Sequence, residues 1–326
     1  MVSAVILAGG LGTRLRPLTN HIPKPLVNMA GTPLIRRIVD SIPQEVDNVY
    51  IAAGYRSDDL RAYFTSAENV RPGIEVVPEE KPLGTAGALW NLRNRLGDEF
   101  IVFNGDVVNS LRIGDMLSFH RSMGSTATIS LWEVDEPEHF GIVRLEKDFT
   151  ITEFMEKPRR EEAFSRLINA GTYIMDSTIF DSMDGRSFSL EKDVFPGLAG
   201  SRLYGYQFSG YWVDCGSLRS YLTAQRILLT IEGLGIQKGA KVDGCAISRP
   251  VAVERGAAVK GSRIGPNVYI ESGAGISEGC AIENSVIMRG AEAGRECTIS
   301  GSIVGPSVRL PDGLESHNQI LVSSSQ

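Results

Sequence analysis

The sequence predicts an α/β protein: a doubly wound, mostly parallel sheet of Rossmann-like design, followed by a left-handed parallel β-helix built from hexapeptide repeats. Two observations lead to this prediction. Up to about Leu234, short apolar runs alternate with amphipathic stretches. After Gly235, aliphatic residues recur at spacings of five or six, which neither a helix nor an ordinary sheet has. A chain of 326 residues also exceeds one comfortable core, so we expect two domains, residues 1–232 and 233–326.

In the first domain, continuous Val/Ile runs are typical of strands buried on both faces, and their alternation with helices implies right-handed crossovers between parallel strands. The expected strands are 2–7, 49–53, 74–77, 100–103 and 127–132. The expected helices are 33–41, 58–66, 86–96, 113–122 and 216–229. Ligands of such sheets bind at the carboxyl ends of the strands.

In the second domain, the aliphatic positions begin at Ile236 and Val242 and continue to Leu310. From Val242 onward, a small or β-branched residue such as Ala257 or Cys280 stands two positions before each of them. This pattern indicates an aliphatic side chain pointing inward on each flat of a triangular prism. We therefore expect four to five coils of β-helix.

The most informative short segment is LAGGLGTRLRPLTNHIPKP, which directly follows the first expected strand. Gly9, Gly10 and Gly12 remove side chains that would hold a triphosphate away from backbone N–H groups, and glycine tolerates the positive φ angles that such a nest needs. Arg14 and Lys24 add positive charge on either side. The segment predicts a phosphate-binding loop; the alternative is a tight turn with solvated basic residues.

This segment resembles the signature G-G-x-G-T-R-L-x-P-L-T…P-K-P of the sugar-1-phosphate nucleotidyltransferases, which have the nucleotide-diphospho-sugar transferase fold. The segments EEKPLGTAGAL, NGD, FGIV, FMEKP, NAGTYI and WVDCG match the family in the same chain order. The resemblance implies nucleotide binding by Leu7, Gly9, Gly10, Gly12, Thr13, Arg14, Lys24, Gly84, Thr85 and Gly87. It implies sugar-phosphate binding by Gly141, Glu156, Lys157, Asn169 and Gly171, and catalysis by Arg14, Lys24, Asp106, Lys157 and Asp214.

The resemblance also identifies Asp106 and Asp214 as the metal-binding carboxylates, with Mg²⁺ as the expected cofactor. Phosphate chemistry agrees, because a magnesium-like ion needs one or two carboxylates plus phosphate oxygens. Each segment alone also has a simpler structural interpretation. An Asp after a strand is often a turn former, Thr85 could cap a helix, and Glu156 with Lys157 could be solvated surface.

The implied reaction is attack of a sugar-1-phosphate on the α-phosphorus of a nucleoside triphosphate, with release of pyrophosphate. The segments EEKPLGTAGAL, LEKDVFP and NAGTYI look most like the mannose-1-phosphate guanylyltransferase (GDP-mannose pyrophosphorylase) branch, which joins GTP to mannose-1-phosphate. One alternative is a glucose-1-phosphate nucleotidyltransferase that uses UTP or dTTP. An alternative of another class is a non-catalytic regulatory subunit or sugar-nucleotide sensor.

Composition limits the other partners. A formal net charge of −6 argues against general nucleic-acid binding. No apolar run reaches membrane-spanning length and the N-terminus lacks a basic region, so we expect no membrane segment and a cytoplasmic protein. The flat faces and open end of a β-helix predict a homo-oligomer, a dimer or a tetramer.

Overall fold

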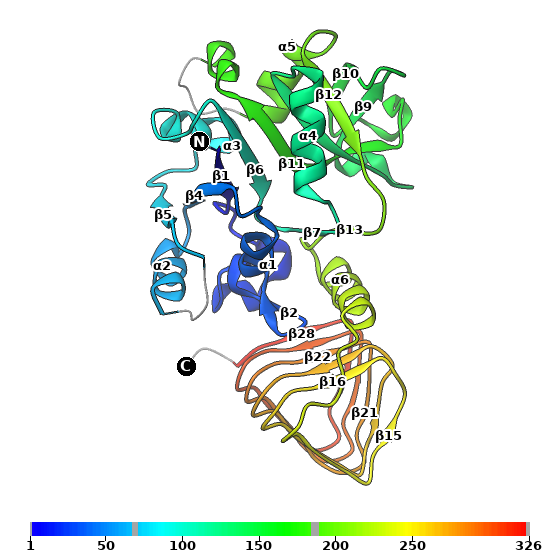
Figure 1. Ribbon diagram of the computed structural model, residues 1–326. Coiled ribbons are helices and arrows are strands. Elements are labelled where there is room, and N and C mark those ends of the chain that lie inside the picture. Colours follow the sequence, from blue (N-terminus) through cyan, green and yellow to red (C-terminus); the bar gives the residue numbers. More distant parts are fainter. Residues whose placement is uncertain (1, 67–70, 184–188, 324–326) are drawn as a thin grey trace. The chain divides into compact units, whose positions relative to one another are not determined.

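A computed structural model describes residues 2–66, 71–183 and 189–323 (Figure 1). The chain forms two compact units, which are described separately: unit 1 comprises Met1–Gly10 and Ile35–Trp212, and unit 2 comprises Leu11–Leu34 and Val213–Gln326. The chain therefore passes from unit 1 into unit 2 within the glycine-rich segment, directly after Gly10. The sequence predicts a boundary at one point of the chain, near residue 232. The two units are instead defined by which residues pack together, and each contains two separate segments of the chain. The domain boundary near residue 232 therefore stays a prediction.

Unit 1 is built on a nine-stranded sheet in the order β10-β9-β11-β6-β1-β4-β5, with β8 pairing to β11 and β12 pairing to β8. The strands are β1 (Val2–Leu7), β4 (Val46–Ala53), β5 (Ile74–Pro78), β6 (Glu99–Asn104), β8 (Ala127–Glu133), β9 (Gly141–Leu145), β10 (Ile151–Glu156), β11 (Leu167–Asp176) and β12 (Leu203–Gln207). The run β6-β1-β4-β5 is parallel, whereas β11 pairs antiparallel with β6, β8 and β9. All five expected strands are confirmed, whereas β9, β10, β11 and β12 were not predicted.

The helices of unit 1 lie close to the expected ranges. They are α1 (Leu34–Ser41), α2 (Ser57–Ser66), α3 (Gly84–Leu92), α4 (Ile113–Met123) and the short α5 (Phe195–Leu198). Helix α3 ends four residues earlier than predicted, because the N–H groups of Arg93 and Arg95 bond to carbonyls only three residues back and tighten the chain into turns. Helix α4 ends at Met123 and is capped by Gly124, which has a φ of 58° and donates its N–H to the carbonyls of His120 and Arg121.

The strand order reverses beside β1. From β1 the chain moves to β4 and β5 on one side, and it then returns to place β6 on the other side. Residues Ala4, Val5 and Ile6 of β1 are fully buried in this position. Ligands of open α/β sheets bind at the carboxyl ends of the strands at such a reversal, so the ends of β1 and β6 are the expected location of a site.

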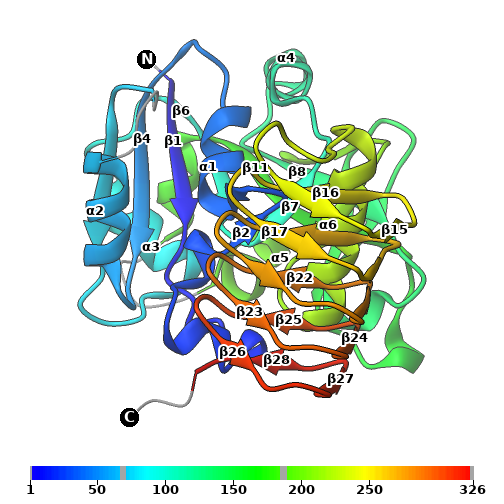
Figure 2. The same ribbon diagram turned by 90° about the horizontal axis from the view of Figure 1, so that it is seen from below.

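The repeat region of unit 2 forms three parallel five-stranded sheets (Figure 2). Each coil of the chain contributes one strand to each sheet, and successive coils are stacked in chain order. The first sheet contains β14 (Lys241–Asp243), β17 (Ala258–Lys260), β20 (Gly275–Ile276), β23 (Glu292–Ala293) and β26 (Arg309–Leu310). The second contains β15 (Ala246–Ile247), β18 (Arg263–Ile264), β21 (Ala281–Glu283), β24 (Thr298–Ser300) and β27 (Glu315–His317). The third contains β16 (Val251–Val253), β19 (Val268–Ile270), β22 (Val286–Ile287), β25 (Ile303–Val304) and β28 (Ile320–Leu321).

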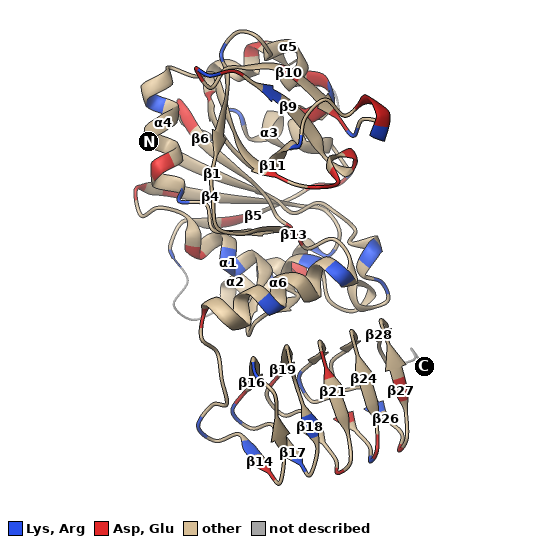
Figure 3. Cartoon of the chain, turned by 90° about the vertical axis from the view of Figure 1, so that its right-hand side faces the viewer, with Lys and Arg blue, Asp and Glu red and all other residues tan. Residues whose placement is uncertain are grey.

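This arrangement is that of the predicted left-handed parallel β-helix, with five coils. The aliphatic positions stack in register, as Val259 on Ile276 and Ile270 on Ile287, and together they form one buried core. Ile236 is an exception: it was expected to point inward but is 47% exposed, because it precedes the first strand of the stack. Both basic and acidic residues are scattered along the coils (Figure 3).

Unit 2 also contains helix α6 (Leu218–Ile231) and a segment from the N-terminal part of the chain. The hydroxyl of Ser217 caps α6 by accepting the N–H of Ser220. The N-terminal segment consists of three short 3₁₀ turns, Thr13–Leu15, Leu18–Asn20 and Lys24–Leu26, followed by the hairpin β2 (Asn28–Met29) and β3 (Thr32–Pro33). Among the described residues, no helix combines the length and apolar content needed to cross a bilayer.

The β-helix core provides a stability test. Ile282, at 2% exposure, packs between Ile264 and Ile299 of the neighbouring coils, so Ile282→Ala should lower the free energy of unfolding by about 2–5 kcal/mol through lost burial and a residual cavity. The matched variant Ile236→Ala should change it by less than about 0.5 kcal/mol. Denaturant titration followed by circular dichroism measures both, and equal losses in the two variants would contradict the assignment of the core.

Candidate functional site

The loops that follow β1 and β6 meet within unit 1. The N–H of Gly105 donates to the carbonyl of Leu7 at 2.9 Å, and a Cβ at Gly105 would lie 2.6 Å from that same oxygen. Only glycine permits this approach. Asp106, the expected metal ligand, therefore follows a turn that is hydrogen-bonded to the end of β1, where the glycine-rich loop begins.

The three glycines of that loop have different roles. Gly12, in unit 2, has a φ of 62°, and a Cβ there would press on Thr19 and Lys24. Gly9 and Gly10, in unit 1, do not have positive φ. At Gly9 a Cβ would lie 2.7 Å from a carboxylate oxygen of Glu79, whereas the space beside Gly10 is open. The expected positive φ thus holds at Gly12, whereas a side chain at Gly9 would displace the Glu79 carboxylate.

Glu79 is a candidate that the sequence interpretation missed. Its backbone N–H bonds to Ala53 at the end of β4, which fixes the residue directly after β5. Desolvation raises the pKa of its carboxyl. A half-buried carboxylate beside a glycine loop is a pattern of functional sites. The only signal in the sequence was its place as the first Glu of EEKPLGTAGAL, immediately after a strand.

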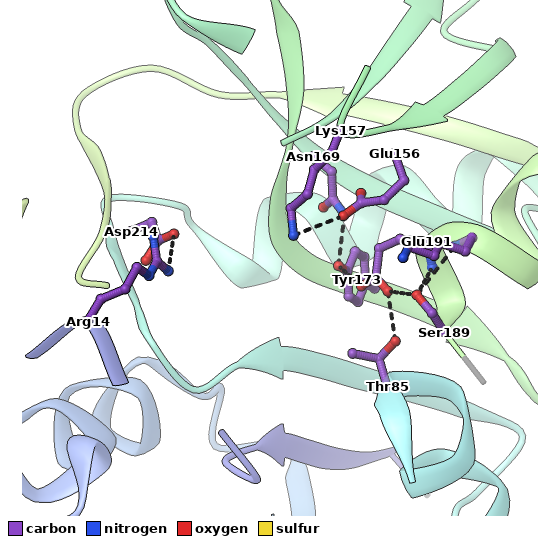
Figure 4. A network of polar contacts seen from close by, with 10 residues as sticks. Arg14, Thr85, Glu156, Lys157, Asn169, Tyr173, Ser189, Glu191 and Asp214 are labelled. Atoms are coloured by element: carbon purple, nitrogen blue, oxygen red, sulfur yellow. Dashed lines mark hydrogen bonds and ion pairs between the residues drawn. The ribbon is translucent and has the colours of Figure 1, made fainter. Parts of the chain in front are cut away.

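Thr85 joins a buried network with Glu191 (Figure 4). Its hydroxyl donates to Glu191 Oε2 at 2.7 Å and accepts the N–H of Leu190 at 2.8 Å. Glu191 also accepts from the hydroxyls of Tyr173 and Ser189. The alternative of Thr85 as a helix cap is wrong, because α3 begins at Gly84 and its first turn has no side-chain cap.

Glu191 therefore connects the nucleotide segment to the segment LEKDVFP, in which it occupies a π-helical turn, Leu190–Val194. Only 9% of Glu191 is exposed. The sequence interpretation used LEKDVFP as a family resemblance and gave Glu191 no role. Ser189 is only two residues away, but Thr85 is distant in the chain and Tyr173 lies within β11, so spacing could not have revealed these two donors.

Glu156 and Lys157 lie at the end of β10. Lys157 Nζ is 3.4 Å from Glu156 Oε1, and the lysine side chain is largely exposed while the glutamate is mostly buried. Desolvation raises the pKa of Glu156, and the nearby Lys157 opposes this shift. A Cβ at Gly141 would lie 2.8 Å from the Glu156 carboxylate and 2.6 Å from the ring of Phe154. The absence of a side chain at Gly141 thus leaves room for the Glu156 carboxylate and the Phe154 ring.

Asn169 and Gly171 lie in the middle of β11. Asn169 donates to Tyr173 Oη at 2.9 Å and accepts the N–H of Gly171 at 2.9 Å. Gly171 has a φ of 80°, and a Cβ there would lie 2.7 Å from Asn104 Nδ2. Asn169 therefore extends the polar network from Glu191 and Tyr173. Gly171 lies against Asn104, the last residue of β6.

In unit 2, Arg14 and Asp214 form an ion pair at 3.6 Å (Figure 4). A Cβ at Gly216 would overlap the Arg14 guanidinium. The glycine of the W-x-D-x-G segment is therefore required so that Arg14 can approach Asp214. Lys24 of the same unit is only 9% exposed and lies beside Gly12 and Thr19, which is unusual for a lysine and indicates a charge held in position.

The remaining expected site residues lie in a 3₁₀ turn of unit 2 and in helix α3 of unit 1. Thr13 begins the first 3₁₀ turn of unit 2, Gly84 is the first residue of α3, and Gly87 is buried within α3. Unit 1 thus holds Leu7, Gly9, Gly10, Gly84, Thr85, Gly87, Asp106, Gly141, Glu156, Lys157, Asn169 and Gly171, and unit 2 holds Gly12, Thr13, Arg14, Lys24 and Asp214.

The donor chemistry fits a divalent ion of the magnesium type. Within the described parts of the chain, no cluster of three or more His, Cys, Asp or Glu residues is arranged to enclose a metal. Magnesium does not need one, since it retains waters and phosphate oxygens as ligands. Asn104 Oδ1, two residues before Asp106, is buried and accepts no hydrogen bond from the described residues. An oxygen ligand is therefore available beside Asp106.

Known proteins match both the N-terminal and the C-terminal part of the chain. The nucleotidyl transferase family matches residues 3–230, and the GMPPB C-terminal domain matches residues 247–322. Mannose-1-phosphate guanylyltransferase 1 of Arabidopsis thaliana is 36% identical over 279 residues, which cover 82% of this chain and 76% of that protein. The mannose-1-phosphate guanylyltransferase of Mycobacterium tuberculosis is 33% identical over 283 residues, covering 83% and 78%.

A solved structure is also similar. HddC from Yersinia pseudotuberculosis, crystallised with GMP-PN, has a TM-score of 0.59 and 31% identity, and the match covers 69% of this chain and 98% of HddC. The α/β unit and the family match over most of the chain define a nucleotide-transferring enzyme. The chain belongs to the nucleotidyl transferase family.

Removal of the Glu191 carboxylate should destabilise unit 1. In Glu191→Ala the buried hydroxyls of Thr85 and Tyr173 lose their acceptor, so the free energy of unfolding should fall by about 1–3 kcal/mol. Glu161→Ala, at an exposed position, is the matched control and should leave stability unchanged. Denaturant titration of both variants decides the question, and equal midpoints for Glu191→Ala and the wild-type chain would contradict the network.

Proposed function

We propose that this chain is a mannose-1-phosphate guanylyltransferase, which joins GTP and mannose-1-phosphate to form GDP-mannose and pyrophosphate. The observation that carries the proposal is the similarity to proteins of that name over about four-fifths of the chain. The C-terminal match supports it, because it extends the similarity into the β-helix. A glucose-1-phosphate nucleotidyltransferase that uses UTP or dTTP remains the alternative.

In the proposed reaction an oxygen of the sugar phosphate attacks the α-phosphorus of the triphosphate, and the bond from the α-phosphorus to the β-phosphate bridging oxygen breaks. Both reactants are anions, so positioning and charge neutralisation supply most of the catalysis. Lys157 is assigned to the sugar phosphate, and Arg14 and Lys24 to the triphosphate. Asp106 and Asp214 would hold Mg²⁺, which neutralises charge on the phosphate oxygens.

An assay of pyrophosphate release tests the substrates. Four nucleoside triphosphates are combined with mannose-1-phosphate and glucose-1-phosphate, and GTP with mannose-1-phosphate should give the highest kcat/KM. Faster turnover of UTP or dTTP with glucose-1-phosphate would reject this branch of the family. A chain that releases no pyrophosphate with any pair would instead support a regulatory subunit or sensor.

The two aspartates should be essential for turnover. Asp106→Asn and Asp214→Asn should each lower kcat by about a hundredfold or more, the usual loss on removing one electrostatic stabiliser of a transition state. Asp58→Asn, on the exposed face of α2, is the control and should leave kcat unchanged. Near-normal turnover in Asp106→Asn would remove the metal assignment.

Glu79 is proposed to read the base. Guanine presents two adjacent donors, N1–H and N2–H, which match the two oxygens of one carboxylate, whereas uracil presents a single N–H. Glu79→Gln should therefore lower kcat/KM for GTP by about tenfold or more, with a much smaller loss for UTP. The neighbouring exposed residue supplies the control variant Glu80→Gln. Equal losses for GTP and UTP in Glu79→Gln would exclude a role in base recognition.

We also propose a homo-oligomer, a dimer or tetramer, in which the β-helix contributes to assembly, because its flat faces and open end favour packing against another copy. A cytoplasmic location remains a prediction from the sequence alone.

A further inference from the structure

The hairpin β2–β3 of unit 2 is held by both α6 and the β-helix. Tyr221 of α6 donates its hydroxyl to the carbonyl of Asn28, and Gln225 accepts the N–H of Ala30 at 2.8 Å. On the β-helix side, Asn28 Nδ2 donates to Glu271 Oε1 at 3.2 Å. Gly31 has a φ of 83°, and a Cβ there would overlap the hydroxyl of Tyr269. The hairpin therefore fits closely against both elements.

Glu271 has a counterpart one coil earlier, which shows what Asn28 contributes. Glu254 and Glu271 follow the paired strands β16 and β19 at equivalent positions. Each accepts a backbone N–H with Oε2, from Ser272 at 2.7 Å for Glu254 and from Arg289 at 2.9 Å for Glu271. Oε1 of Glu254 accepts the hydroxyl of Tyr269, which belongs to the β-helix itself. Oε1 of Glu271 accepts from Asn28, a residue 243 positions away.

The environment of Glu271 makes that hydrogen bond important. Only 3% of Glu271 is exposed, and burial raises the pKa of its carboxyl, while the hydrogen bonds from Arg289 and Asn28 act in the opposite direction. Glu254 lies close enough to raise this pKa further. A buried carboxylate needs its donors, because leaving one oxygen without a hydrogen bond has a large desolvation penalty.

The hairpin is directly joined to the turn that carries Lys24. The N–H of Val27 donates to the carbonyl of Lys24 at 3.1 Å, and the carbonyl of Val27 accepts the N–H of Leu34 at the end of the hairpin. Lys24 in turn lies beside Gly12 and Thr19, and Thr19 donates to the carbonyl of Gly12 at 2.8 Å. A continuous set of contacts thus leads from Glu271 through Asn28 to the phosphate-binding segment.

We propose that Glu271 is a positioning residue for the phosphate-binding segment: its hydrogen bond with Asn28 lets the β-helix hold Lys24 and Gly12 in the geometry that binds a triphosphate. This inference rests on the assignment of that segment to the nucleotide in the proposed function. It gives the β-helix a role in substrate binding within a single chain, in addition to any role in assembly.

Reversing the polarity of the hydrogen bond tests the proposal. Asn28→Asp places two carboxylates together, and Asn28→Asp combined with Glu271→Gln restores one donor and one acceptor in the opposite sense. Glu271→Gln alone should be mild, because the Asn28 amide can turn to present its oxygen. Asn284→Asp, which adds the same charge at an exposed corner of the β-helix, is the matched control.

The probe is inorganic tripolyphosphate with Mg²⁺, because it reports on the phosphate-binding segment without a base or a sugar. Calorimetric titration of the full chain at pH 7.5 should show about three- to thirtyfold weaker binding in Asn28→Asp, the range over which residues without ligand contact modulate affinity. The double variant and Asn284→Asp should bind as the wild-type chain does. The loss of tripolyphosphate affinity in Asn28→Asp should become smaller as the pH is lowered toward 5. At that pH the introduced carboxyl and Glu271 can share a proton, which removes their repulsion. The other charged groups that face Glu271 are Glu254 and Arg289.

Hydrogen exchange separates positioning from general destabilisation. In Asn28→Asp the amides of Val27 and Ala30 should exchange faster, while those of the β-helix core keep their protection. Unchanged tripolyphosphate affinity in Asn28→Asp overturns the proposal, and so does a double variant that fails to recover. If Asn28→Asp does not fold, Asn28→Ala takes its place, and unchanged affinity in that variant has the same meaning. A wild-type chain that does not bind tripolyphosphate would instead reject the phosphate assignment on which both proposals rest.

Discussion

The close approach of two backbone segments at one edge of the sheet is the constraint from which the site in unit 1 follows. Leu7 ends β1, Gly105 follows β6, and the hydrogen bond between them leaves no room for a Cβ at Gly105. Neighbouring parallel strands end at the same edge, so the glycine-rich loop and the turn that leads to Asp106 start from adjacent points. The backbone thus places the Asp106 turn at that edge before any side-chain contact is considered.

Buried carboxylates organise the polar side chains around this framework. Glu191 accepts the hydroxyls of Thr85 and Tyr173 within unit 1, and Glu271 accepts the amide of Asn28 within unit 2. An ionised group removed from water requires several donors, and each donor must come from an element that packs against it. These carboxylates therefore join segments that are far apart in the chain, and they restrict how those segments can move.

The β-helix packs with part of the N-terminal glycine-rich segment. Residues Leu11–Leu34, which carry most of the predicted phosphate-binding segment, lie in one unit with the β-helix and α6. The glycine-rich loop consequently begins in one unit and ends in the other. Loops that carry binding residues need a rigid support, and for the part after Gly10 the structure provides it through the hairpin and its contacts with Tyr221 and Glu271.

The sequence alone determined the parallel strands, the helices and the coils of the β-helix, because their periodicities arise from side chains only a few residues apart. It also predicted a phosphate-binding segment, because glycine permits close approach of the backbone and lysine supplies positive charge. It did not predict the strands β9 to β12, the position of Glu79 against Gly9, or the partners of Glu191 and Glu271. Those features depend on pairs that are distant in the chain, such as Asn28 with Glu271, and a hydrogen bond between distant residues leaves no period or spacing in the sequence; only the tertiary structure decides which donor reaches which carboxylate.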